Sequence, residues 1–378
     1  MTLDHLVRTL FEVWQCASTA GQAPQSTVML GAPGIGKTSA AMALADRLTA
    51  HERARGATCD AVCEVRDLSS CLPEDIGGLP YRDGGVTRYA PQQWMERLCD
   101  PASYGVLILD DLPAAMAAVQ VATRQLVLTH RIHDAKLSPR IMVIVTGNRR
   151  QDRSGATSLP AHFRNSVLMV PVEADAADWE QWYLSQGLPA VIPNFIKFRP
   201  AFFSQLPADA DANGAFATPR SWVALARVLE AANRAGALRE VASGLVGEGV
   251  ASEFLHYAVV QQSLPDIRAV LADPARVVPD PGETMALPDR AVALVQALAS
   301  AAAEDGRGAE PVPALAKYLS ALAWLTHHSG CEYAAISIDT FTTQQGSVED
   351  LQRAARTLQS NEQVSLMMNR LTAAFGGS

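Results

Sequence analysis

The chain has 378 residues, of which 48% are hydrophobic and 19% charged, with a formal net charge of −8. This length predicts two or three domains, and the composition excludes a disordered chain. The acidic balance disfavours a sequence-independent nucleic-acid binder. The N-terminus carries no secretory leader pattern, and no apolar run reaches about 18 residues, so we expect a cytoplasmic protein without a membrane span.

The first predicted elements surround a glycine-rich loop. Apolar residues at helical spacing predict a helix over residues 2–17, and an apolar run predicts a buried strand over residues 27–30. The next octapeptide fits G-x-x-x-x-G-K-[ST] and leads into an Ala-rich helix that starts at Ser39. The octapeptide consists of Gly31, Ala32, Pro33, Gly34, Ile35, Gly36, Lys37 and Thr38.

The residue types in this loop suit phosphate binding. Glycines let backbone N–H groups turn inward, and the following helix directs the positive end of its dipole at an anion. Lys37 would reach the β- and γ-phosphates, and the Thr38 hydroxyl would be a ligand of Mg²⁺. Strand, loop and helix together favour nucleotide binding, and a chance glycine-rich turn is the alternative interpretation.

A hairpin is predicted between the second strand and the next helix. The second strand is expected over residues 61–65 and the helix over residues 92–98. Between them, Asp83-Gly84-Gly85 separates two short β-prone stretches, which is typical of a hairpin. A second short hairpin is expected over residues 131–139.

Polar residues end two of the remaining strands. The apolar run 106–109 leads into Asp110 and Asp111, and the run 141–145 leads towards Asn148. Strands of this kind are buried in parallel sheets, whose ligands bind at the carboxyl ends. Asp110 would hold Mg²⁺, while Asp111 and Asn148 would orient a water. Loop-start aspartates and a turn-forming Asn are the alternative interpretations. A fifth strand is predicted over residues 167–172.

The pattern becomes helical from Asp178 onward. Thr218-Pro219 predicts a helix start that places Arg220 in the first turn, where a cation is unfavourable. A nucleotide phosphate would be a suitable partner, and an ordinary salt bridge is the alternative. Four prolines within residues 274–288 predict a linker, and three further helices are expected over residues 289–305, 311–328 and 347–375.

These motifs in this order resemble the AAA+ ATPases, and in detail the MoxR-like branch. The resemblance rests on Gly31–Thr38, on Asp110-Asp111, on Asn148, on Arg220 and on the inserted hairpin, and it covers roughly residues 25–270. It implies an α/β fold, an AAA+ P-loop core with a five-stranded parallel sheet between helices, then an α-helical lid and a C-terminal helical region. The implied divisions are an N-terminal helix and linker (1–24), the core (25–177) with its hairpin (about 72–89), the lid (178–275) and the extension (276–378).

The resemblance also implies ATP and Mg²⁺ as cofactors and a homo-oligomeric ring, a hexamer, that remodels a protein client. Relatives often work with a partner that contains a von Willebrand factor A domain. The two hairpins would face the central pore. The function of residues 276–378 is not implied by the resemblance.

Two departures from the family pattern lead to alternatives. The usual Asp-Glu pair is Asp110-Asp111 here, and displacing a catalytic group by about 1 Å can cost on the order of 100-fold in rate. The usual arginine finger is replaced by Ser166, with Arg164 as the nearest substitute and Arg149, Arg150 and Arg153 also close. One alternative is therefore an ATP-gated assembly scaffold with little hydrolysis. Another is a nucleic-acid-directed AAA+ motor, which the acidic net charge disfavours.

Overall fold

The computed structural model describes residues 2–149, 161–206, 214–308, 310–327, 332–344 and 346–375. The chain divides into two compact units, Met1–Leu188 with Phe202–Ala231 and Pro189–Ala201 with Ala232–Ser378. Residues of the predicted lid, 178–275, occur in both units, and the domain boundaries at 178 and 276 stay predictions. Among the described helices, none is both long and apolar enough to cross a membrane.

The first unit is built on a five-stranded parallel sheet, as predicted, with the strand order β2-β5-β8-β1-β9. The strands are β1 (Thr27–Leu30), β2 (Val62–Asp67), β5 (Tyr104–Asp110), β8 (Arg140–Gly147) and β9 (Leu168–Pro171). Asp67 is paired in register with Asp110, and Leu30 with Gly147. The carboxyl ends of four neighbouring strands therefore lie along one edge of the sheet.

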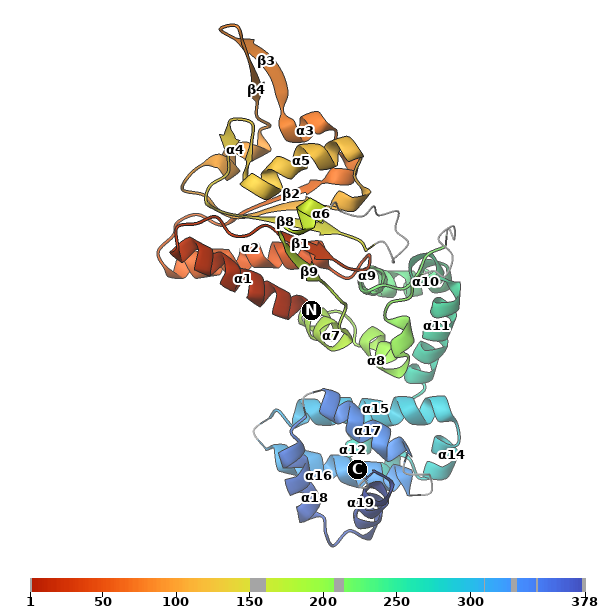
Figure 1. Cartoon of the computed structure of the whole chain (residues 1–378). Helices are drawn as coiled ribbons and strands as arrows, with labels where there is room; N and C mark the ends of the chain where they lie inside the picture. Colours follow the sequence, from red (N-terminus) through yellow and green to blue (C-terminus); the bar gives the residue numbers. More distant parts are fainter. Residues whose placement is uncertain are drawn as a thin grey trace. The chain divides into compact units, whose positions relative to one another are not determined.

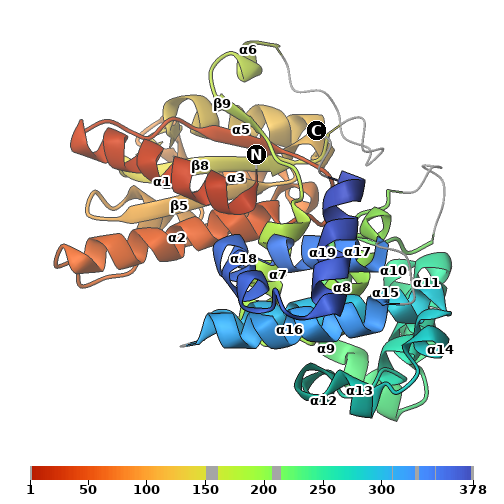
Figure 2. The same cartoon turned by 90° about the horizontal axis from the view of Figure 1, so that it is seen from below.

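Helices cover both faces of this sheet (Figure 1). One face carries α1 (Leu3–Thr19) and α2 (Lys37–Ala54), which run side by side (Figure 2). The other carries α3 (Pro73–Gly77), α4 (Trp94–Cys99) and α5 (Ala117–Thr129). The apolar runs within β5 and β8 supply side chains to a separate hydrophobic core on each face. This two-sided burial explains their unbroken apolar runs.

Both predicted hairpins are present. The strands β3 (Leu79–Asp83) and β4 (Val86–Ala90) pair antiparallel, project from the unit (Figure 1), and expose every residue. The strands β6 (Arg131–Ile132) and β7 (Ala135–Lys136) form the shorter hairpin. The ring of Tyr89 in β4 stacks on His133 at the tip of the shorter hairpin, with centroids 3.7 Å apart and an interplanar angle of 4°. The two hairpins are therefore in contact.

Short helices complete the first unit. They are η1 (Leu68–Ser70), η2 (Leu112–Ala114), α6 (Ala161–Arg164) and α7 (Ala176–Ser185). The longer helix α9 (Pro219–Arg234) belongs to this unit up to Ala231, and η4 (Pro200–Phe202) has residues in both units. The first residue of α9 is Pro219, as predicted, and the Thr218 hydroxyl accepts the backbone N–H of Ser221 at 3.1 Å. This cap satisfies one of the free N–H groups at the start of α9.

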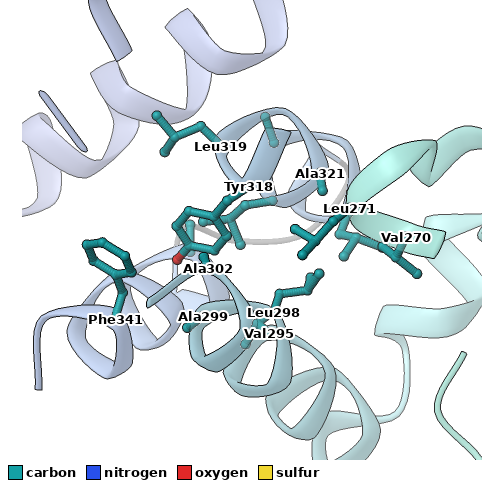
Figure 3. Packing of buried hydrophobic residues seen from close by; sticks show 14 of the residues in the cluster. Val270, Leu271, Val295, Leu298, Ala299, Ala302, Tyr318, Leu319, Ala321 and Phe341 are labelled. Atoms are coloured by element: carbon teal, nitrogen blue, oxygen red, sulfur yellow. The ribbon is translucent and has the colours of Figure 1, made fainter. Parts of the chain in front are cut away.

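The second unit is helical. Its helices are α8 (Val191–Phe198), α10 (Leu238–Val246), α11 (Glu248–Gln262), α12 (Ile267–Ala272), α13 (Pro274–Val277), α14 (Pro281–Met285), α15 (Pro288–Asp305), α16 (Pro311–Thr326), α17 (Glu332–Thr343), α18 (Val348–Thr357) and α19 (Glu362–Phe375). Figure 3 shows part of its core, where Leu298, Tyr318 and Phe341 are fully buried.

Two sequence expectations for this unit are wrong. Residues 274–288 are not a linker, because Pro274 and Pro281 occupy first helical positions, where proline is favourable. Asp273 and Asp280 cap these helices. The single helix expected over residues 347–375 is interrupted between α18 and α19, and α17 was not anticipated.

Candidate functional site

The loop between β1 and α2 has the conformation that a phosphate cradle requires. Gly34 and Gly36 have φ angles of 73° and 97°, in the left-handed region that favours glycine. A Cβ on Gly34 would lie 2.8 Å from the Thr218 hydroxyl, and one on Gly31 would lie 2.5 Å from the Val172 carbonyl oxygen. Neighbouring segments therefore enclose the loop too closely for side chains at Gly31 and Gly34.

Lys37, Thr38 and Ser39 form the first turn of α2 directly after the loop. The Lys37 side chain is buried, and its ammonium donates to the Gly31 and Ala32 carbonyls at 3.0 and 2.8 Å. It also donates to Asn148 Oδ1 at 2.9 Å. Two predicted site residues 111 positions apart are therefore in direct contact. The ammonium lies within the loop, where a bound phosphate could take over some of these hydrogen bonds.

Thr38 and Asp110 lie together at the carboxyl edge of the sheet. The Thr38 hydroxyl donates to Asp110 Oδ1 at 2.8 Å, and the Thr146 hydroxyl donates to the same oxygen. Mg²⁺ prefers oxygen ligands and binds proteins through few carboxylates together with substrate phosphates. The donor set at this edge therefore suits Mg²⁺, with Thr38 and Asp110 as the residues that would hold it.

Asp111 turns the chain away from β5 with an unusual backbone. Its φ of 55° is left-handed, and its N–H donates to the Thr146 hydroxyl at 3.3 Å. Burial, and then the nearby Asp110 carboxylate, raise the pKa of Asp111 above its ordinary value. Its Oδ1 atom is buried and accepts no hydrogen bond from the described residues. Such an oxygen is available to a water or a ligand.

Asp67 adds a third carboxylate to this edge. It ends β2 beside Asp110, and hydrogen bonds from Ser69 lower the pKa of Asp67, which favours its anionic form. Sequence patterns pointed to Asp110 and Asp111 but did not single out Asp67 or Thr146. The available signal for Thr146 was a hydroxyl residue at the end of an otherwise apolar run.

Arg220 lies beside the phosphate loop. Its backbone N–H donates to the Gly34 carbonyl at 3.0 Å. The residue is exposed, and no ion pair joins its guanidinium to the part of the chain that the structure describes. The salt-bridge alternative therefore has no support in that part. Arg164 is exposed at the end of α6, and its role as a trans-acting finger concerns a neighbouring subunit and stays a prediction.

A pocket of about 420 Å³ opens beside the loop. This volume is typical of small-molecule sites, so the loop has space next to it for the rest of a nucleotide. The lining residues are Ala32, Ile35, Arg149, Val172, Glu173, Ala174, Ser204 and Leu206.

Comparison with known proteins yields distant structural similarity. No protein-family model matches the sequence, and no curated protein matches it. A structure of Aeropyrum pernix ORC2, described with ADPNP and ADP, is 13% identical, with 99% of this chain and 94% of that chain covered at a TM-score of 0.39. A. pernix ORC1 in complex with DNA is 16% identical, with 85% and 83% covered at a TM-score of 0.38. Thermotoga maritima RuvB, described as a Holliday junction branch migration motor, is 13% identical, with 72% and 75% covered at a TM-score of 0.37. At these values the similarity carries no functional conclusion.

Proposed function

We propose that the chain is a Mg²⁺-dependent ATPase of the AAA+ class that resembles the MoxR-like branch, assembles as a ring and remodels a protein client. The observation that carries the ATPase proposal is the meeting of the phosphate loop with the strand ends. Thr38 lies 2.8 Å from Asp110, and Lys37 lies 2.9 Å from Asn148. Sequence-distant residues with the chemistry of phosphate and metal binding are thus brought into contact.

Each residue has a definite part in this proposal. The loop N–H groups and Lys37 bind the phosphates, and Thr38 and Asp110 hold the metal. Bound Mg²⁺ would offset the negative charge that builds up on the phosphate oxygens. Asp111 and Asn148 orient the attacking water. Arg220, whose backbone is hydrogen-bonded to the loop, places a cation beside the phosphates.

ATP turnover tests the proposal. Lys37→Ala removes the ammonium and should weaken ATP binding and hydrolysis together. Asp111→Asn keeps the shape of the side chain but removes the charge, so it should bind ATP normally while hydrolysis is lost. Wild-type turnover no higher than that of either variant would contradict an ATPase function.

The exposed hairpin supports a protein client. Large apolar side chains stand exposed on the hairpin at Leu79, Tyr81 and Val86, and the register of β3 and β4 places these three on one face. An exposed apolar face of this kind is typical of a protein contact site. An Asp111→Asn protein held in the ATP state should retain its client during affinity purification, and the same preparation with Tyr81→Ser and Val86→Ser added should lose it.

The ATP-gated scaffold is the second candidate, because Asp111 and Ser166 replace the Glu and Arg of the family pattern. A scaffold should remain assembled for hours in ATP, and size-exclusion chromatography with ATP, ADP or neither measures this directly. Asp111→Glu adds the missing methylene. It should raise turnover by up to about 100-fold if the short carboxylate limits hydrolysis.

A nucleic-acid-directed motor is the remaining alternative. The net charge of −8 disfavours it. Stimulation of ATP turnover by DNA or RNA that disappears at high salt would favour it over a protein client.

A further inference from the structure

Thr146, near the end of β8, contacts both aspartates at the edge of the sheet. The residue is buried, with 1% of its surface exposed. Its hydroxyl donates to Asp110 Oδ1 and accepts the backbone N–H of Asp111 at 3.3 Å. One side chain therefore joins the carboxylate of the first aspartate to the main chain of the second.

Thr146 is hydrogen-bonded to the backbone of Asp111, whose conformation is energetically unfavourable for an aspartate. The left-handed φ of 55° at Asp111 is uncommon outside glycine and persists where surrounding contacts maintain it. The next residue of β8 is fitted to the same corner, because a Cβ on Gly147 would lie 2.4 Å from Cδ of Pro113. Thr146 and Gly147 thus restrain the Asp110–Pro113 corner, one by hydrogen bonds and the other by its missing side chain.

We propose that Thr146 is a positioning residue for ATP hydrolysis, an inference that depends on the ATPase function proposed above. Its hydroxyl fixes the Asp110 carboxylate, which would hold the metal, and the direction in which Asp111 leaves the strand. Thr146 is placed to act through these two residues, and losing its hydroxyl should displace both carboxylates. A catalytic group displaced by about 1 Å can lose on the order of 100-fold in rate.

Two substitutions of Thr146 isolate the contribution of its hydroxyl. Thr146→Val keeps the shape and removes both hydrogen bonds, whereas Thr146→Ser keeps the hydroxyl. Thr123→Val is the matched control, since Thr123 is also fully buried in the first unit. Among the residues that the structure describes, its hydroxyl bonds only to carbonyls of its own helix, those of Val119 and Gln120. Thr146→Ala gives the same comparison should the valine variant fold poorly.

Two measurements are needed, kcat for ATP hydrolysis and the ATP affinity by calorimetry with Mg²⁺ or with EDTA. In Thr146→Val we expect kcat to fall about 100-fold. The gain in ATP affinity that Mg²⁺ provides should shrink, while the affinity in EDTA stays that of the wild type. Thr146→Ser should retain most of the wild-type kcat and most of the gain in ATP affinity from Mg²⁺. Thr123→Val should alter neither kcat nor that gain.

The outcomes separate this inference from the function on which it depends. A wild type that binds no ATP in the presence of Mg²⁺ overturns both. A wild type that binds and hydrolyses ATP, with Thr146→Val equal to it in both measurements, overturns only the positioning role. So does a Thr146→Ser protein as impaired as Thr146→Val, or a Thr123→Val protein with the same losses.

Discussion

The Lys37 ammonium donates a 2.9 Å hydrogen bond to the side-chain carbonyl of Asn148. The loop between β1 and α2 and the residue that follows β8 are thereby joined by a side-chain hydrogen bond. In the proposed ATPase, a triphosphate bound in the loop would compete with Asn148 for the Lys37 ammonium.

Substitution of Asn148 tests this connection. Asn148→Ala leaves Lys37 its two carbonyl partners, so ATP affinity should change little. The loss of one preorganised polar group should lower kcat by about 100- to 1000-fold. Asn148→Asp instead places a negative charge beside the phosphates and should weaken ATP binding. Calorimetry and steady-state turnover measure both effects, and equal turnover in Asn148→Ala and the wild type would refute the role in hydrolysis.

Gly34 should tolerate no side chain. Its φ is 73°, and an added Cβ would lie 2.8 Å from the Thr218 hydroxyl. We expect Gly34→Ala to lower the free energy of unfolding by about 1–3 kcal/mol and to weaken ATP binding. Gly21→Ala is the control, because Gly21 has a φ of 64° but no atom within 4 Å of the added Cβ. Urea denaturation of both variants isolates the steric part, and identical losses would show that the contact with Thr218 contributes nothing.

His130 should make the protein less stable in mild acid. Burial lowers the pKa of His130, whose Nε2 lies 3.0 Å from the Ser26 hydroxyl, and Nδ1 has no partner among the described residues. The unfolded chain therefore binds a proton first, and this contribution to stability is present above about pH 6.5 and lost as the pH falls below it. The contribution of His130 to the slope of the free energy of unfolding against pH should reach at most about 1.4 kcal/mol per pH unit.

Denaturation at several pH values measures that slope. His130→Asn keeps a residue that tolerates the φ of 53° and does not titrate, so the dependence on pH should flatten. His5→Asn, at an exposed position of α1, is the control for exchanging a histidine for an asparagine. An undiminished slope in His130→Asn would assign the effect to other groups.

The core of the second unit should depend on Phe341. This residue is fully buried, and its ring centroid lies 5.8 Å from that of Tyr318 (Figure 3). Phe341→Ala should lower the free energy of unfolding by about 3–5 kcal/mol. Val259→Ala, at a position that is 66% exposed, should change it by less than about 0.5 kcal/mol. The phosphate loop belongs to the first unit. Under conditions in which the Phe341→Ala protein is folded, its ATP affinity should therefore equal that of the wild type.

The sheet could be predicted because its strands are short apolar runs that end in polar residues. Asp110 directly follows such a run and Asn148 lies three residues after the end of another, which marked them as candidates. Thr146 also ends an apolar run, but this signal does not reveal its contacts, since a hydroxyl residue there has the same sequence signature whether it faces a core or a carboxylate. The contact of Thr146 with Asp110 and Asp111 depends on the pairing of β5 with β8, which are distant in the sequence.

The helical region was harder to predict. Proline is read as a helix breaker, yet Pro274 and Pro281 begin helices, since the first helical position needs no N–H donor. The break between α18 and α19 lies in a stretch without glycine or proline. Its signal is Asn361, whose side chain accepts the backbone N–H groups of Gln363 and Val364 and caps α19.

The projecting hairpin β3–β4 has no side chain in either core of the first unit. Substitutions of its residues should therefore have little effect on the stability of the fold, provided that the tight turn and the Tyr89–His133 stack are kept. Substitutions on its surface would therefore change what the hairpin contacts without altering the packing of either core.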